Sequence, residues 1–72
     1  KTGIGSEAIR LALRYAFDKL RCEQVYAEVL ASNEASQQML RGIGFKHTAT
    51  LPRWHWQDNH YEDLHYYQIW HP

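Results

Sequence analysis

The chain opens on KTGIGSEAIRLALRYAFDKLRCEQVYAEVL (residues 1–30), which places a glycine pair, a helical pattern and a strand pattern in direct succession. A helix is predicted over Ser6 to Leu20, because apolar side chains recur there at spacings of three and four residues. These are Ile9, Leu13, Phe17 and Leu20, supported by Ala12 and Ala16. Ser6 can cap the start of this helix, and Lys19 and Arg21 complement the dipole at its end.

A strand is predicted over Gln24 to Leu30, where side chains alternate between two faces. One face carries Val25, Ala27 and Val29, and the other carries Tyr26, Glu28 and Leu30. If Glu28 were buried, its carboxylate would need a partner or a proton. Glu28 is therefore a functional carboxylate, or else an exposed or simply paired side chain.

The glycine pair stands where the helix begins and suggests a phosphate-binding site. Glycines permit tight turns and close approach to main-chain N–H groups, and the first turn of a helix leaves such groups unpaired. Together with the positive end of the helix dipole, these groups favour a phosphate or pyrophosphate. The N–H groups concerned belong to Gly3, Ile4, Gly5 and Ser6.

Three interpretations compete for this segment. A mononucleotide-binding loop is excluded, because no Gly-Lys-Ser or Gly-Lys-Thr occurs in the chain. A dinucleotide fingerprint fits formally as Gly3-x-Gly5-x-x-Ala8, but the nearest acidic residue at the required distance, Glu28, falls inside the next strand rather than at its end. The third interpretation is an ordinary helix start with flexible glycines.

Length and composition limit the class of protein. A chain of 72 residues holds at most one small domain. Its formal net charge is zero, which argues against nucleic acid or an anionic membrane as the main partner. The lone Cys22 cannot form an intrachain disulfide, and this suits a reducing cytoplasm. No apolar run approaches the ~20 residues of a membrane span.

The remaining sequence predicts a short helix and two strands. The helix starts at the Ala31-Ser32-Asn33-Glu34 segment, runs through about Arg41 and is ended by two glycines. Strands are predicted over Phe45 to Leu51 and over Tyr61 to Trp70, with turn chemistry between them. The turn residues are Pro52, Asp58 and Asn59. Trp54 and Trp56 share one face of an extended segment, where they either cover a small core or line a substrate pocket.

The segment Asn33-x-x-Ser36, followed by Ile43-Gly44-Phe45, resembles the GNAT superfamily of N-acetyltransferases, and most closely the branch that acetylates ribosomal-protein N-termini and polyamines. The stretch Asp58 to Tyr67 resembles that branch's late turn and acidic-aromatic strand. The resemblance covers essentially all 72 residues and displaces the dinucleotide interpretation. It implies the C-terminal half of a GNAT fold: an α/β (α+β) single partial domain over residues 1–72, ordered helix-strand-helix-strand-strand with a mixed sheet.

The resemblance also implies a cofactor and site residues. Acetyl-CoA would be the donor, its pyrophosphate held by the N–H groups of Gly3, Ile4, Gly5 and Ser6. Asn33 matches the family position that hydrogen-bonds the pantetheine, although capping the short helix would explain it equally well. Many members protonate the departing thiolate with a tyrosine, at a position where this chain has Leu40. Ser36 is the branch's substitute and our candidate catalytic residue.

The acceptor implied is a primary amine, such as a protein N-terminus or a small amine. The general base is left open among Glu28, His55 and Glu62, a group outside the chain, and bulk water. No metal site is expected, because Cys22 is isolated and the histidines form no compact cluster. The alternative function is a catalytically inactive CoA-binding or interaction module. The edge of the strand Gln24 to Leu30 is a template for homodimer pairing or strand exchange.

Overall fold

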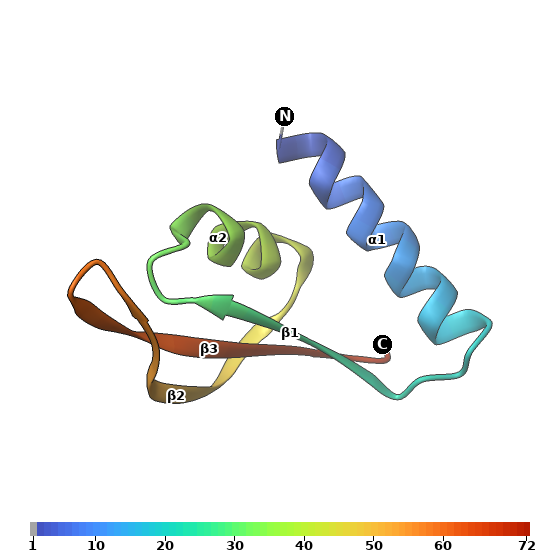
Figure 1. Ribbon diagram of the computed structural model, residues 1–72. Coiled ribbons are helices and arrows are strands. Elements are labelled where there is room, and N and C mark those ends of the chain that lie inside the picture. The colour runs from blue at the N-terminus through green and yellow to red at the C-terminus, as the bar shows by residue number, and fades with distance from the viewer. Residues whose placement is uncertain (1) are drawn as a thin grey trace.

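The computed structural model describes residues 2–72 as two helices lying on one side of a three-stranded sheet (Figure 1). The elements in chain order are α1 (Thr2–Asp18), β1 (Gln24–Leu30), α2 (Glu34–Ile43), β2 (Lys46–Gln57) and β3 (His60–Trp70). The order helix-strand-helix-strand-strand and the α+β class are confirmed. The bounds of β1 match the sequence prediction.

The sheet has the strand order β1-β3-β2, and both pairings are antiparallel. The expectation of a mixed sheet is therefore wrong for the strands described. The reason is topological: β1 and β2 run in the same direction, but β3 lies between them, so the two parallel strands never pair. Within residues 2–72, β1 pairs on one side only, and the expected pairing of its other edge with a second chain stays a prediction.

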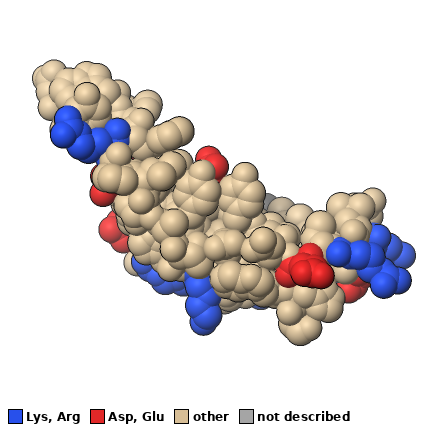
Figure 2. Space-filling model, turned by 90° about the horizontal axis from the view of Figure 1, so that it is seen from below, with Lys and Arg blue, Asp and Glu red and all other residues tan. Residues whose placement is uncertain are grey.

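The core lies between the sheet and the two helices. Its buried members are Leu13, Phe17, Val29, Leu40, Phe45 and Tyr67. Val25 and Ala27 pack against this cluster, whereas Tyr26 and Glu28 are exposed, so the alternation predicted for β1 is confirmed. The opposite face of the sheet carries no helix, and viewed from below its middle is largely uncharged (Figure 2).

Helix α1 begins at Thr2, four residues earlier than predicted, and ends at Asp18 rather than Leu20. The glycine pair thus lies inside the first turn, and Ser6 is not the N-cap. A helix once nucleated extends cheaply, and each glycine costs only about 1 kcal/mol, while no proline stops α1 at Ser6. At the other end, Arg21 adopts a φ of 59° and the Cys22 N–H donates to Ala16 O at 3.0 Å, which closes the last turn. Lys19 and Arg21 consequently follow the helix instead of lying in its last turn.

Strand β2 runs through to Gln57, six residues beyond the predicted end at Leu51. Pro52 does not end the strand, because β2 is an edge strand and an irregularity between Leu51 and His55 absorbs the missing N–H donor. The predicted turn at Asp58 and Asn59 is correct, and their φ values of 54° and 65° suit a two-residue hairpin. The part of β2 after Leu51 and the part of β3 before Leu64 therefore form a long hairpin, which we call the hairpin arm.

Membrane insertion through a helix finds no support here: neither α1 nor α2, the helices within residues 2–72, combines the length and apolar character that a bilayer crossing needs.

Candidate functional site

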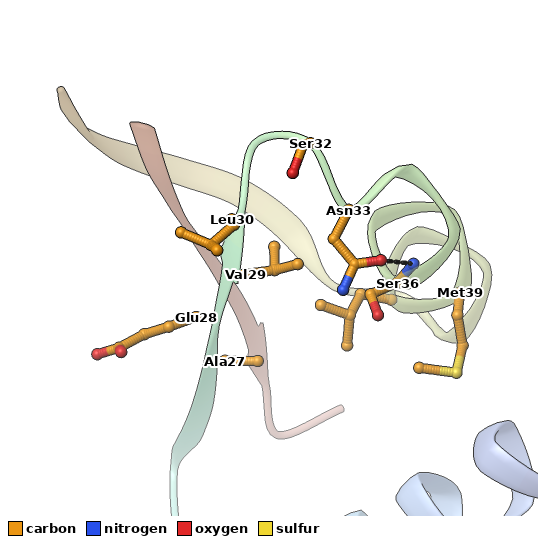
Figure 3. A pocket seen from close by; sticks show the side chains of 9 residues that line it. Ala27, Glu28, Val29, Leu30, Ser32, Asn33, Ser36 and Met39 are labelled. Carbon is orange, nitrogen blue, oxygen red and sulfur yellow. Dashed lines mark hydrogen bonds between the residues drawn. The ribbon is translucent and has the colours of Figure 1, made fainter. Parts of the chain in front are cut away.

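A pocket of about 580 Å³ lies between β1 and α2, beside the free edge of β1 (Figure 3). It is lined by Ala27, Glu28, Val29, Leu30, Ser32, Asn33, Ser36, Met39 and Leu40. The strand supplies one wall, the Ser32–Asn33 turn supplies the end, and the first turns of α2 supply the other wall. Two residues singled out from the sequence, Asn33 and Ser36, are thus brought together at one pocket.

Asn33 is the N-cap of α2, and its side-chain oxygen accepts the Ser36 N–H at 3.2 Å. The capping interpretation of Asn33 is therefore correct. The amide nitrogen of Asn33 is left pointing into the pocket beside the Ser36 hydroxyl (Figure 3). One asparagine can cap the helix with its oxygen and donate to a ligand with its nitrogen.

The edge of β1 offers backbone groups to the same pocket. Ala31 N–H donates to Asp63 O and His71 N–H donates to Glu23 O, both at 2.9 Å. Because alternate residues of a strand direct their backbone groups to opposite sides, the odd-numbered residues of β1 face β3. The N–H and C=O groups of Tyr26, Glu28 and Leu30 consequently face the free edge.

A second hollow, of about 290 Å³, lies where α1 approaches α2. Ser6, Arg10, Ala35, Gln38, Met39 and Gly42 line it. Met39 borders both pockets, and its sulfur lies 3.5 Å from where a Cβ on Gly5 would stand. The two hollows thus meet at Met39 and lead from the end of β1 toward the N-terminal part of α1.

The predicted phosphate-binding residues lie at that N-terminal part. Gly3 and Ile4 fall among the first three residues of α1, whose N–H groups lack partners within the helix. Ser6 comes after the first turn, where the regular helical pattern occupies its N–H. Phosphate binding by Gly3, Ile4, Gly5 and Ser6 stays a prediction, and at Ser6 it would require the first turn to open.

The three candidate bases lie in three different places. The Glu28 side chain points away from Ser36, toward the face of the sheet that carries no helix (Figure 3). His55 lies on the exposed hairpin arm, where its Nε2 donates to Gln57 Oε1 at 3.0 Å. Glu62 lies on β3 next to the turn that follows β1, where its carboxylate accepts the Ser32 N–H at 3.3 Å.

Electrostatics weaken the case for Glu62 as a base. Hydrogen bonding by the Ser32 side chain, with contributions from the Ser32 N–H and His60, holds the pKa of Glu62 below its ordinary value of 4.5. A general base is most effective when its pKa lies near the working pH, so Glu62 is better suited to fixing the turn. On the uncovered face, a hydrogen bond to Glu28 raises the pKa of Tyr66 above 10.0.

Leu40, at the position where many family members have tyrosine, is buried in the core and reaches the floor of the pocket. Trp54 and Trp56 are 59% and 58% exposed, so they cover no core within the part of the chain that the structure describes. Across residues 2–72, no three His, Cys, Asp or Glu side chains gather as a metal site would need.

The sequence analysis missed Gln37, which is 3% exposed. Its side chain connects α2 to Ala31, which follows β1, and to β3. Its amide bonds Ala31 O, Tyr67 Oη and His65 Nδ1. The available signal was its spacing, since Gln37 lies three residues before the apolar Leu40 and hence on the apolar face of α2.

Comparison with known proteins identifies the family. Residues 1–46, more than half of the chain, match the family model described as an acetyltransferase (GNAT) domain. The chain belongs to this family. A search of curated proteins gives no match.

Solved structures of similar fold are numerous. A probable acetyltransferase is 28% identical with a TM-score of 0.86, over 94% of this chain and 38% of its own. The dodecameric spermidine N-acetyltransferase from Vibrio cholerae is 24% identical with a TM-score of 0.87, over 94% of this chain and 40% of its own. A GNAT-family acetyltransferase from Bacillus anthracis is 24% identical with a TM-score of 0.85, over 97% of this chain and 42% of its own. The present chain thus spans about two-fifths of the length of these relatives.

Proposed function

We propose that this chain forms the coenzyme-binding part of an N-acetyltransferase, which transfers the acetyl group of acetyl-CoA to a primary amine. The observation that carries the proposal is the meeting of Asn33, Ser36 and the free edge of β1 at one pocket, in a chain that belongs to the GNAT family.

The residues fit the pantetheine arm of acetyl-CoA chemically. That arm alternates short apolar stretches with two amide groups. Val29, Met39 and Leu40 give the pocket apolar walls, and the backbone groups along β1 can pair with amides as a neighbouring strand would. The hollow between α1 and α2 reaches Ser6 and Arg10 on α1, which gives the diphosphate a route toward the N-terminal part of that helix.

Ser36 is the residue we assign to catalysis. A neutral amine would attack the thioester carbon, the oxygen would gain negative charge, and the nitrogen would lose its extra proton to water or to the base that the sequence leaves open. The carbon–sulfur bond would then break and release a thiolate. A hydroxyl donor beside the sulfur stabilises this developing charge, and such a donor is worth about 10²-fold or more when it is well placed. Ser36 Oγ lies in the pocket wall (Figure 3), and the Asn33 cap fixes the first turn that carries it.

Either a polyamine or a protein N-terminus would serve as the amine acceptor. The Vibrio cholerae relative is a spermidine acetyltransferase, which supports a small amine. We place the reaction in the cytoplasm, an inference supported by the single free cysteine. Assembly with further copies is supported by the dodecameric Vibrio cholerae relative, and it would use a surface other than the β1 edge that we assign to the coenzyme.

The experiment is a comparison of Ser36→Ala with wild type in the full-length protein. Calorimetric titration with CoA should give the same dissociation constant for both, while turnover with a panel of amines should fall about 10-fold to 100-fold. Thr48→Ala is the control, since its hydroxyl lies exposed on β2 against Tyr66 O at 3.5 Å. Unchanged turnover in Ser36→Ala removes this serine from the mechanism.

A second function, coenzyme binding without catalysis, is favoured by one observation. Leu40 is buried where many relatives have a proton-donating tyrosine, so a protonating group is lacking at that point. CoA binding by the wild type, with no transfer to any amine, would support this function. Absence of CoA binding would contradict both.

A further inference from the structure

The amide of Gln37 makes three hydrogen bonds, one through its nitrogen and two through its oxygen. Its Nε2 donates to Ala31 O at 2.8 Å, and its Oε1 accepts from Tyr67 Oη at 2.8 Å and from His65 Nδ1 at 3.1 Å. Among the polar and charged residue types of residues 5–72, for which burial is described, only Gln37 is buried. Tyr67 itself is 0% exposed.

The network defines the orientation of each group. The Gln37 nitrogen must face Ala31 O, because a carbonyl oxygen only accepts. The Gln37 oxygen must then accept twice, so Tyr67 donates its O–H and His65 carries a proton on Nδ1. Reversing the amide would set oxygen against oxygen at Ala31 and leave that carbonyl without its donor, at the cost of an unpaired group.

Gln37 fixes the turn between β1 and α2, which carries Ser32 and Asn33 at the pocket. Ala31 follows the last residue of β1, its N–H donates to Asp63 O at 2.9 Å, and its C=O accepts from Gln37. Both backbone groups of Ala31 are thereby fixed, one by β3 and one by α2. The next residues along the chain are Ser32 and Asn33, which line the pocket, while Gln37 itself does not line it.

We propose that Gln37 is a positioning residue, whose hydrogen bond to Ala31 O sets the spacing between the end of β1 and the first turn of α2 and so places Asn33 and Ser36 for acetyl transfer. The effect on turnover rests on the proposed function. The effect on the geometry of the turn does not, and this separates the two in the experiment.

The decisive variant is Gln37→Glu in the full-length protein. A carboxylate can still accept from Tyr67 and His65, but it cannot donate to Ala31 O. We expect kcat to fall about tenfold or more, because small misplacements of a reacting geometry are costly, and KM for acetyl-CoA to rise as well, because the displaced turn also carries the Asn33 nitrogen that faces the pocket. Gln68→Glu is the matched control: it adds the same charge and removes a donor, here to Gln24 Oε1 at 2.6 Å, on the exposed part of β3.

A pH profile adds a second readout. Acid protonates the carboxyl introduced by Gln37→Glu, whose pKa burial raises and hydrogen bonds from Tyr67 and His65 lower, and the protonated carboxyl can donate to Ala31 O as the amide does. The ratio of kcat in Gln37→Glu to kcat in wild type should therefore rise as the pH falls from about 8 toward about 5. The same ratio for Gln68→Glu should stay flat.

Two further variants separate positioning from stability. Tyr67→Phe removes one donor to Gln37 but keeps the bond to Ala31 O, so it should lower the melting temperature and leave kcat within about twofold. The double variant Gln37→Met, Tyr67→Phe removes both side chains of the Gln37–Tyr67 hydrogen bond, so that no buried Tyr67 hydroxyl is left unpaired, and it does not restore the bond to Ala31 O. It should fold stably and still turn over slowly. If kcat instead follows melting temperature across the set, Gln37 is only structural and the proposal fails.

Amide hydrogen exchange tests the turn without any substrate. The Ser36 N–H, which donates to Asn33 Oδ1, should exchange at least about tenfold faster in Gln37→Glu than in wild type, whereas Gln68→Glu should match wild type. Unchanged exchange at Ser36 overturns the proposal. Faster exchange in a protein that binds no CoA would support the positioning role and contradict only the proposed function.

Discussion

Helix α2 and the hairpin arm of β2 and β3 differ in how far their side chains are buried. In α2, Leu40 is buried in the core and Gln37 satisfies every partner it faces. In β2, by contrast, every residue is exposed, two tryptophans included. The difference shows that buried side chains are concentrated at the β1–α2 junction, where the pocket lies, whereas β2 keeps its side chains at the surface.

The largest effect that would test this comparison is expected from Phe45→Ala. Phe45 is 4% exposed and belongs to the core cluster that seats α2. Its truncation should lower the free energy of unfolding by about 3–5 kcal/mol, measured by urea denaturation of the full-length protein. A loss below about 1 kcal/mol would mean that the junction is not the packed region that the structure shows.

Asn33 allows a sharper test of the same junction. Asn33→Ala removes the cap of α2 and should cost about 1 kcal/mol of stability. Asn33→Asp keeps an oxygen that accepts the Ser36 N–H but removes the Nδ2 donor that points into the pocket, so stability should stay close to that of wild type while KM for acetyl-CoA rises. If both substitutions change stability and KM in parallel, the two roles of Asn33 cannot be separate.

A smaller effect is expected from pH, through Glu62. Its pKa lies below the ordinary 4.5 because the folded state stabilises the carboxylate, chiefly through Ser32. The unfolded state therefore binds its proton first as the pH falls. The stability that Glu62 contributes is fully present above about pH 4.5 and is lost as the pH falls through the lower folded pKa.

Glu62→Gln gives the corresponding measurement. The difference in unfolding free energy between wild type and this variant should be constant at neutral pH and shrink below about pH 4.5. A difference that grows on acidification would mean that the carboxyl pKa is raised and that the Ser32 contact is wrongly assigned.

The smallest effect is expected from the hairpin arm. Trp54 is 59% exposed, so Trp54→Ala should change the free energy of unfolding by no more than about 0.5 kcal/mol, measured in the same denaturation experiment as Phe45→Ala. A loss comparable to that of Phe45→Ala would show that the arm packs against another part of the protein or another copy.

Much of the fold could be read from local patterns. The alternation of Val25, Ala27 and Val29 gave β1 its bounds, and the sequence around Asn33 gave the start of α2. The start of α1 could not be read, since two glycines suggest a loop by propensity alone, while the helix that follows them extends at little cost. The end of β2 could not be predicted from Pro52 for a related reason. A proline is tolerated in an edge strand, and which strand lies at the edge is a property of the whole sheet.

The site was predictable only in part. Asn33 and Ser36 could be proposed through the resemblance of Asn33-x-x-Ser36 to the GNAT family, and the structure brings both to one pocket. The role of Gln37 could not, because its three partners come from the end of β1 and from β3, up to 30 residues away. Likewise, the separation of Glu28, His55 and Glu62 depends on strand faces and register, which no single segment encodes.

The central claim is that the pocket beside β1 receives the acetyl end of acetyl-CoA, and the most direct test is a crystal structure of the full-length protein with CoA bound. The account predicts the pantetheine arm along the free edge of β1, with the sulfur within hydrogen-bonding reach of Ser36 Oγ and the Asn33 nitrogen donating to the arm. A coenzyme held elsewhere, with this pocket filled only by solvent, would contradict it.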